Sequence, residues 1–237
     1  MVEMTFKYER HNQIWQTLCR ADLNLLAENK AFFAGGTCIA LFYGEHRESE
    51  DIDFLCDVEH YGAFRNMVAQ RGLACVFPGA QPDMRVDRYG IRGRVDGVRL
   101  EILLEARAPV FGAVHDSGML VAAPECLMAE KLLANSDRWM DAAYLHKDMI
   151  DLAAVYIKSP DSLGHAYEMA HGAYKDSVSR DFSSALQRFA KPEIRKEIAA
   201  KFKMNPEVLA QMLPCLVQIR NAIQHFDADK ENSAPCP

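Results

Sequence analysis

The stretch Ala34-Gly-Gly-Thr-Cys-Ile-Ala-Leu-Phe-Tyr-Gly-Glu-His-Arg-Glu-Ser-Glu-Asp-Ile-Asp-Phe54 decides the fold of this chain. Its order predicts a short strand, a glycine turn, a helix that opens at Thr37 and a second strand that begins at Asp51. Gly35 and Gly36 leave the backbone open at the start of the helix, where free N–H groups and the helix macrodipole attract phosphate. The stretch therefore predicts a phosphate-binding turn between two strands.

The second strand carries two carboxylates on one side. Because successive side chains of a strand alternate, Asp51 and Asp53 point one way while Ile52 and Phe54 point the other. Their Cα atoms are about 6.6 Å apart, so both carboxylates can converge on a pair of Mg²⁺ ions about 3.5–4 Å apart. Taken alone, a Gly-Gly pair is more often a tight turn, and Asp-x-Asp is more often the solvated face of a strand. In combination they indicate a phosphate cradle beside a metal-binding pair, as phosphoryl or nucleotidyl transfer requires.

The ordered motif resembles a known family. Gly-Gly-Thr at 35–37, a gap of helix length and then Arg47-x-Ser49-x-Asp51-x-Asp53 with an apolar flank resemble the head motif of the nucleotidyltransferase superfamily, and most closely the AbiEii/AbiGii toxin family. The resemblance covers roughly residues 31–156. It implies a toxin of a bacterial type IV toxin–antitoxin or phage-defence system, with an NTP as substrate and a cognate antitoxin as partner. Several members of the family modify the acceptor end of tRNA, so the resemblance implies an RNA acceptor.

A third acid is expected on a neighbouring strand. In the superfamily this acid commonly follows a basic residue in a hydrophobic run, and Glu101 in Val98-Arg-Leu-Glu-Ile102 matches that pattern. It would complete the shell of Mg²⁺ (or Mn²⁺) and help to deprotonate the attacking hydroxyl. Asp96 and Glu105 are weaker rivals, and Asp96 is sufficiently explained by a turn. The predicted catalytic residues, which are also the predicted metal ligands, are Asp51, Asp53 and Glu101.

A helical region extends the resemblance. The runs Pro124-Glu-Cys-Leu-Met-Ala-Glu-Lys-Leu-Leu-Ala134 and Lys147-Asp-Met-Ile-Asp-Leu152 match the family pattern, in which a helical lysine reaches the nucleotide phosphates and an acid on the following helix supports the site. Lys131 is thereby implied at the triphosphate. Asp148 and Asp151 lie one turn apart on one side of their helix, and either could anchor the lysine or lie near the substrate.

Two residues before the carboxylates complete the predicted substrate site. Arg47 could grip a phosphate with two hydrogen bonds, and Ser49 could bond a phosphate oxygen. An ion pair of Arg47 with an acidic neighbour is the plainer alternative. The full set of predicted substrate-binding residues is Gly35, Gly36, Thr37, Arg47, Ser49, Lys131, Asp148 and Asp151.

Composition is that of an ordinary globular protein. The chain has 237 residues, 49% hydrophobic and 25% charged, and no run approaches the length that spans a bilayer. The first twelve residues lack the apolar core of a signal peptide. Seven cysteines without any Cys-x-x-Cys pair indicate free thiols in a reducing compartment, so we expect a cytoplasmic protein without a structural zinc site.

The charge is unevenly distributed. The formal net charge is −6, which gives no general attraction for nucleic acid, but two segments are locally basic. One is the arginine-rich segment 85–99 and the other is the segment 158–203. Either could form a basic face for a phosphate backbone, and solvated helix and hairpin surfaces explain the charges as well.

The pattern along the chain predicts an α+β fold: a nucleotidyltransferase-like mixed sheet with flanking helices, followed by a C-terminal helical bundle. The expected domains are 1–122, the nucleotidyltransferase core, and 123–237, a helical domain that completes the active-site cleft. Strands are expected at 31–34, 51–58, 85–94 and 98–105, with Asp96-Gly97 as a hairpin turn. The helices are expected to end near Gln224, with a frayed tail from Asp227.

Two other functions are compatible with the sequence. A nucleotidyltransferase of the same core could modify a small molecule such as an aminoglycoside. Arg220 and His225 have the Arg-x-x-x-x-His form of HEPN-type ribonucleases, in which both side chains cooperate in acid–base cleavage of RNA. A pattern with two fixed positions arises easily, and the alternative is a surface arginine and a partly buried histidine.

Overall fold

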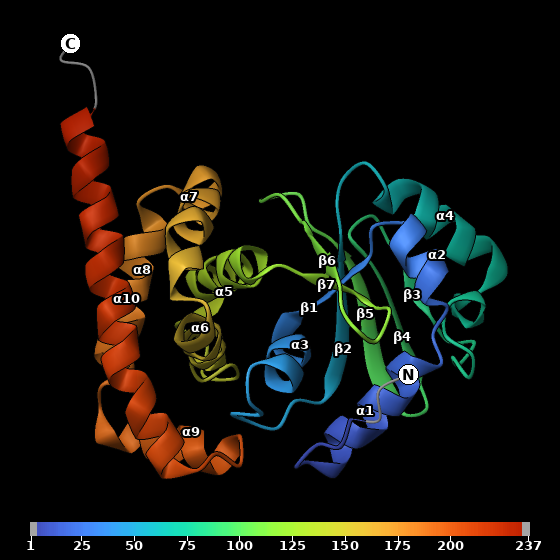
Figure 1. Cartoon of the computed structure of the whole chain (residues 1–237), viewed down its shortest axis with the longest axis horizontal. Coiled ribbons are helices and arrows are strands. Elements are labelled where there is room, and N and C mark those ends of the chain that lie inside the picture. Colours follow the sequence, from blue (N-terminus) through green and yellow to red (C-terminus); the bar gives the residue numbers. More distant parts are fainter. Residues whose placement is uncertain (1–3, 234–237) are drawn as a thin grey trace. The chain divides into compact units, whose positions relative to one another are not determined.

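A computed structural model describes the backbone of residues 4–233 and the side chains of residues 4–229. The chain divides into two compact units between Cys126 and Leu127, where the sequence predicted a boundary at 122/123. The first unit contains the sheet and the second contains helices (Figure 1). This confirms the predicted α+β fold class.

The first unit is built on a mixed seven-stranded sheet of order β3-β4-β5-β2-β1-β7-β6. The pairs β2–β5 and β1–β7 are parallel, and the other neighbours are antiparallel. The strands are β1 (Phe32–Ala34), β2 (Asp51–Cys56), β3 (Arg85–Val86), β4 (Gly90–Val95), β5 (Val98–Leu104), β6 (Gly112–Val114) and β7 (Leu120–Ala122).

One strand expected from the sequence is divided in two. The segment 85–94 forms β3 and β4, because Asp87 accepts hydrogen bonds from the backbone N–H groups of Tyr89 (2.8 Å) and Gly90 (3.0 Å) and so closes a turn between them. The predicted hairpin turn is confirmed. Asp96 and Gly97 both have positive φ, as a two-residue turn between β4 and β5 requires.

The central strands have one apolar face and one charged face. Ile52 and Phe54 of β2 pair in register with Leu100 and Ile102 of β5, and all four are fully buried. Removing apolar side chains of this size from water stabilises the fold by about 1.5–3 kcal/mol each. The residues between them carry the charges, so the same alternation that builds the core presents carboxylates on the other face.

Helices flank the sheet on both sides. In Figure 1, α2 and α4 lie on one side and α3 lies on the other. The first helix packs Ile14, Trp15 and Leu18 into the core, at the spacing of an amphipathic helix. The helices of this unit are α1 (Glu9–Cys19), α2 (Leu23–Glu28), α3 (Gly35–Phe42), α4 (Tyr61–Arg71) and the 3₁₀ turn η1 (Leu73–Cys75).

The second unit is helical throughout its regular elements. They are α5 (Pro124–Arg138), which begins just before the division, α6 (Lys147–Lys158), the 3₁₀ turn η2 (Pro160–Ser162), α7 (Leu163–Tyr174), α8 (Ser177–Phe189), α9 (Pro192–Lys201) and α10 (Pro206–Ser233). The expected end near Gln224 is wrong, because α10 continues to Ser233. Tyr167 of α7 donates a hydrogen bond to Asp227 and stacks on Phe226 with ring centroids 6.0 Å apart. Residues 234–237 of the expected tail lie outside the described residues.

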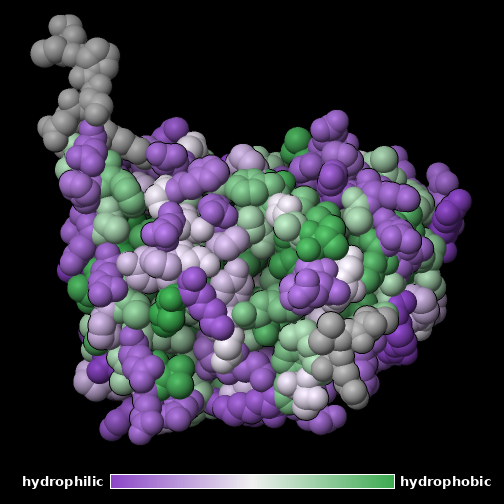
Figure 2. Space-filling model, viewed as in Figure 1, coloured by the Kyte–Doolittle hydropathy of each residue, from purple (hydrophilic) through white to green (hydrophobic). Residues whose placement is uncertain are grey.

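The described helices lack the properties of a membrane span. Within residues 4–233, no helix combines the length and the apolar character that crossing a bilayer requires. In the view of Figure 2, hydrophilic residues are spread over the surface, with hydrophobic residues exposed in groups between them. The six described cysteines are free, and Cys236 lies outside the described residues.

A buried histidine makes the helical unit sensitive to acid. His146 precedes α6 in a left-handed conformation (φ 57°), its side chain is buried, and its Nδ1 has no hydrogen-bond partner among the described residues. Burial, assisted by Arg188, lowers the pKa of His146 from 6.5 to about 4. The folded state therefore favours the neutral imidazole, so this stabilisation is complete above pH 6.5 and is lost as the pH falls toward 4.

We expect His146→Asn to reduce the acid sensitivity of the protein. Asparagine tolerates the left-handed conformation and does not titrate. Between pH 7 and pH 5 the native protein should lose about 2 kcal/mol of unfolding free energy that the variant retains. Urea unfolding at both pH values measures the difference. Equal losses in both proteins would show that His146 is not the titrating group.

Candidate active site

Asp53 and Glu101 lie side by side on the charged face of the sheet. β2 and β5 are parallel, and their register pairs Asp51 with Arg99 and Asp53 with Glu101. Paired residues of neighbouring strands point to the same face, and the strands are about 4.8 Å apart. Three acids therefore share one face of two adjacent strands, although Glu101 of β5 is far from Asp51 and Asp53 of β2 in the sequence.

The two rival acids are occupied elsewhere. Asp96, in the β4–β5 turn, forms an ion pair with Arg20. Glu105 is buried just beyond the end of β5, and its Oε2 lies 2.6 Å from Nη2 of Arg107. Of the three candidates for the third acid, only Glu101 is placed beside Asp53 by the strand register.

Arginines neutralise the carboxylates on this face. Arg99 forms an ion pair with Asp51, and Nε of Arg92 lies 3.6 Å from Oε1 of Glu101. The hydrogen bond to Asp51 raises the pKa of Arg99 above its ordinary value, so its positive charge is permanent. Acidic side chains and arginines thus lie next to one another on the charged face of the central strands.

Gly35 fits directly against Asp53. Its φ is +71°, and a Cβ atom at this position would lie only 2.4 Å from Oδ2 of Asp53. No side chain can occupy that space without displacing the carboxylate. The glycine turn predicted from the sequence is therefore in contact with the carboxylate strand, and Ala34 is the register partner of Asp53.

Hydrogen bonds hold the turn and the loop before β2 together. Thr37 Oγ1 donates to the backbone carbonyl of Asp51 and lies 2.8 Å from Oγ of Ser49. The N–H of Ser49 donates to Nε2 of His11, 2.9 Å away, and Nδ1 of His11 is 2.7 Å from Oε1 of Glu45. Because Nε2 accepts, Nδ1 carries the proton and donates it to Glu45.

His11 is a positioning residue that the sequence reasoning missed. It is fully buried, and burial lowers its pKa against the opposing effect of Glu45, which favours the neutral tautomer that Ser49 requires. A signal was available, because His11 has helical spacing to Ile14, Trp15 and Leu18 of the buried face. A polar residue on such a face needs a partner.

The remaining predicted residues of this unit lie in the turn itself and in the loop before β2. Gly36 is partly exposed at the start of α3, after the fully buried backbone of β1. Arg47 is 5% exposed, and its Nη1 donates to the backbone carbonyl of Glu48, 3.0 Å away. The structure thus brings together the predicted turn, loop and carboxylates of the first unit.

The donor chemistry of this face fits a divalent metal ion. Carboxylate oxygens are the ligands that Mg²⁺ and Mn²⁺ prefer, and the absence of a side chain at Gly35 leaves room for the Asp53 carboxylate beside the turn. Among residues 4–233, no three His, Cys, Asp or Glu side chains gather closely enough to surround a metal. Asp51 and Glu101 face Arg99 and Arg92 instead.

The helical unit contains a buried charge cluster of its own. Nζ of Lys131 lies 3.0 Å from Glu130, 3.5 Å from Asp148 and 3.7 Å from Asp151. Asp148 also accepts two hydrogen bonds from Arg138, at 2.8 and 2.7 Å. Both candidate acids of α6 therefore face the lysine.

The cluster keeps Lys131 and Asp148 charged. Burial lowers the pKa of Lys131, but the acids around it, Glu130 first, outweigh burial and raise it above the ordinary value. For Asp148, burial acts to raise the pKa, and Lys131 and Arg138 outweigh it and lower the pKa. The stabilisation from Asp148 is therefore present at neutral pH and is lost as the pH falls below the ordinary range of a carboxyl group.

We expect Lys131→Met to destabilise the protein strongly. The change leaves buried carboxylates with less counter-charge, which costs about 3–5 kcal/mol when one partner of a buried pair is removed. Chemical unfolding measures the loss. Adding Asp151→Leu to the variant should restore part of it, and Lys158→Met, at an exposed lysine on α6, serves as the control. Unchanged stability of Lys131→Met would mean that the cluster does not hold the helices together.

Arg220 and His225 do not form a pair. Both lie on α10, and their side chains contact other residues. Arg220 donates to Asn221, and Nε2 of the exposed His225 lies 3.5 Å from Asp229. The geometry gives no support to the HEPN alternative.

Comparison with known families decides the relationship. Residues 16–213 match the model of the family described as "Nucleotidyl transferase AbiEii toxin, Type IV TA system". The chain belongs to this family. The match confirms the resemblance read from the sequence and extends it in both directions, and it shows that this AbiEii-family protein is a nucleotidyltransferase. No curated protein matches the chain.

Solved structures similar to this AbiEii-family chain have low sequence identity. JHP933 from Helicobacter pylori is 18% identical, with a TM-score of 0.48 over 95% of this chain and 98% of that one. ANT(2")-Ia in complex with adenylyl-2"-tobramycin is 12% identical, with a TM-score of 0.44 over 68% and 97%. An antigenic nucleotidyltransferase-like protein from Paracoccidioides brasiliensis is 13% identical, with a TM-score of 0.46 over 83% and 94%.

Proposed function

We propose that this protein transfers a nucleoside monophosphate from an NTP to the hydroxyl at the 3′ end of tRNA, as the cytoplasmic toxin of a toxin–antitoxin pair with a cognate antitoxin. One observation carries the proposal: Gly35 touches Asp53, and Asp53 is the register partner of Glu101. A turn suited to phosphate thus adjoins a row of carboxylates suited to metal-assisted transfer.

The residues of the first unit have two different roles, phosphate binding and metal binding. The Gly35-Gly36-Thr37 turn, Arg47 and Ser49 bind the nucleotide phosphates, and the carboxylates Asp51, Asp53 and Glu101 would hold a divalent metal. Mg²⁺ or Mn²⁺ bound there would supply charge neutralisation at the phosphates and make the acceptor hydroxyl more acidic. Lys131, Asp148 and Asp151 belong to the proposal as the contribution of the helical unit.

The reaction is an in-line displacement. The acceptor hydroxyl gives its proton to a carboxylate of the sheet and its oxygen attacks the α-phosphorus, while the bond from that phosphorus to the bridging oxygen of pyrophosphate breaks. Pyrophosphate leaves with the bonding electron pair. The protein contributes positioning and charge, without a covalent intermediate.

Labelling with nucleotides tests the proposal. The protein is incubated with each of the four α-labelled NTPs, Mg²⁺ and total tRNA, and the RNA is separated by size. Labelled tRNA of increased length is the expected result. Shortened RNA would indicate a ribonuclease instead, and a label that appears on an added aminoglycoside but not on tRNA would indicate a small-molecule acceptor.

A further inference from the structure

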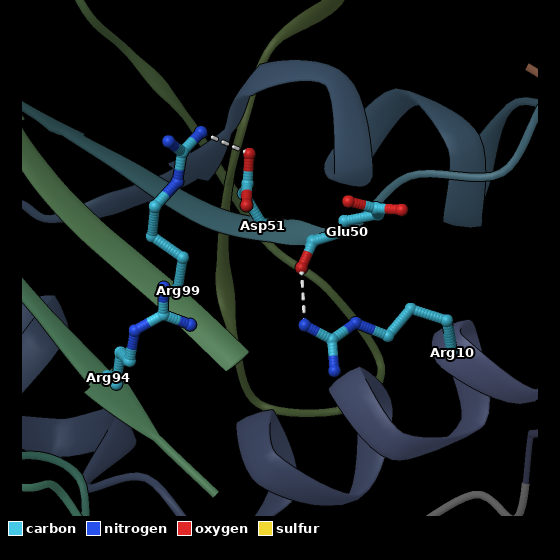
Figure 3. A pocket seen from close by; sticks show the side chains of 5 residues that line it. All are labelled: Arg10, Glu50, Asp51, Arg94 and Arg99. Carbon is cyan, nitrogen blue, oxygen red and sulfur yellow. Dashed lines mark hydrogen bonds and ion pairs between the residues drawn. The ribbon is translucent and has the colours of Figure 1, made fainter. Parts of the chain in front are cut away.

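A pocket opens on the charged face beside Asp51. It encloses about 280 Å³ and is lined by Arg10 of α1, Glu50, Asp51, Arg94 of β4 and Arg99 of β5. Figure 3 shows the guanidinium groups of Arg10 and Arg94 pointing toward the same gap, with Arg99 held against Asp51. All five residues belong to the first unit.

The pocket has more positive charge than its own acids neutralise. Asp51 pairs with Arg99, and Glu50 contributes its backbone carbonyl to Nη2 of Arg10, at 3.0 Å. In the described part of the chain, neither Arg10 nor Arg94 forms an ion pair with an acidic side chain. Arg10 is fixed by Gln13 (2.7 Å), and Arg94 has only a long contact of 3.5 Å to the carbonyl of Gly97.

The strand register places like charges opposite one another. Arg94 of β4 and Arg99 of β5 are direct cross-strand partners. Like charges in this position destabilise a sheet by a few tenths of a kcal/mol, up to about 1 kcal/mol. An anion bound between them would remove that cost, and planar guanidinium groups are suited to the paired hydrogen bonds of phosphate oxygens.

The place of the pocket indicates which phosphate it receives. Across the sheet, the glycine turn follows β1, Asp51 and Asp53 lie on β2, and Arg99 and Arg94 lie on β5 and β4. The carboxylates thus separate the turn from the arginines. In an in-line displacement the attacking and leaving oxygens lie on opposite sides of the phosphorus. If the turn holds the leaving phosphates, the arginines lie on the side from which the acceptor enters.

We propose that Arg10, Arg94 and Arg99 form a subsite for a phosphodiester group of the acceptor RNA, next to the hydroxyl that reacts. This subsite rests on the proposed function, and it adds Arg10, a residue of the first helix, to the acceptor side. It binds through charge and geometry and carries no base specificity. The nucleotide uses the glycine turn, so its affinity is independent of Arg10 and Arg94.

The double variant R10Q/R94Q tests the subsite. Arg99 is left in place because it neutralises Asp51. The control is R65Q/R71Q, which removes two arginines of α4 in the same unit and changes the net charge equally. Binding of labelled total tRNA is measured between 50 and 200 mM NaCl, and the KM for the NTP is measured at saturating tRNA. R94Q alone is measured as well, because Arg10 also fixes Glu50.

The subsite predicts a specific loss. R10Q/R94Q should bind tRNA about tenfold more weakly at low salt, and the slope of log affinity against log salt should fall by one to two units, about one for each lost phosphate contact. R94Q should lose about half of that slope, and the control should match the native protein. The KM for the NTP should change less than twofold in every variant.

Three results would overturn the subsite. A raised KM for the NTP with an unchanged tRNA salt slope would assign the pocket to the nucleotide or to pyrophosphate. A tRNA affinity of R10Q/R94Q equal to that of R65Q/R71Q, in a protein whose native form labels tRNA, would refute the subsite and leave the proposed function intact. A native protein that neither labels nor binds tRNA would refute both.

Discussion

Asp53→Asn is expected to lower the rate of nucleotidyl transfer on the order of a thousandfold, with the fold preserved. Asp53 adjoins the glycine turn and is the register partner of Glu101, so it is the carboxylate most central to the proposed metal and phosphate site. Loss of outer groups around a metal costs about 10–100-fold, and loss of a ligand costs more. The amide keeps the shape of the side chain and removes only its charge.

Rates and stability are measured together for this variant. Single-turnover transfer of label to tRNA gives the chemical step, and thermal unfolding should shift by less than about 2 °C, as expected for a substitution outside the core. Asp83→Asn, at an exposed aspartate of the same unit, is the matched control. A rate for Asp53→Asn within about threefold of the control would remove Asp53 from the catalytic set.

Gly35→Ala is expected to reduce the rate of nucleotidyl transfer on the order of a hundredfold by displacing the carboxylate of Asp53. The added methyl group would lie 2.4 Å from Oδ2 of Asp53, so one of the two must shift. A misplacement of about 1 Å at a reacting group costs about a hundredfold in rate. The positive φ of this residue adds about 1 kcal/mol of backbone strain.

Gly97→Ala separates the two effects of that substitution. Gly97 also has a positive φ, of +77°, but a Cβ atom there meets nothing within 4 Å. Both variants should therefore lose unfolding free energy from the strained φ, Gly35→Ala should lose more because of the contact with Asp53, and only Gly35→Ala should lose activity. Equal activities at equal loss of stability would show that the turn does not position Asp53.

Local sequence patterns predicted most of the first unit. Alternation of polar and apolar residues is a property of a strand by itself, so the face shared by Asp51 and Asp53 could be read before the structure was known. The pairing with Glu101 required the resemblance, because β2 and β5 are far apart in sequence. The division of the segment 85–94 depended on a side-chain turn at Asp87, which competes with strand pairing.

Contacts between distant segments escaped the sequence. Arg10 and His11 lie before residue 16, where the family match begins, yet the structure places them beside the loop that precedes β2. The surroundings of Lys131 were predicted only in part, because Asp148 and Asp151 were expected as its possible anchors and Glu130 was not. The continuation of α10 to Ser233 depended on packing by Tyr167, which no local signal reports.

The parallel pairing of β2 with β5 affects when the carboxylates come together during folding. A contact of such long range forms slowly, since the loop between the strands must close before the pairing can stabilise it. During synthesis, a nascent chain that has not yet exposed β5 holds Asp51 and Asp53 without Glu101 beside them. The proposed carboxylate site is therefore complete only after β5 has paired with β2, late in the folding of the chain.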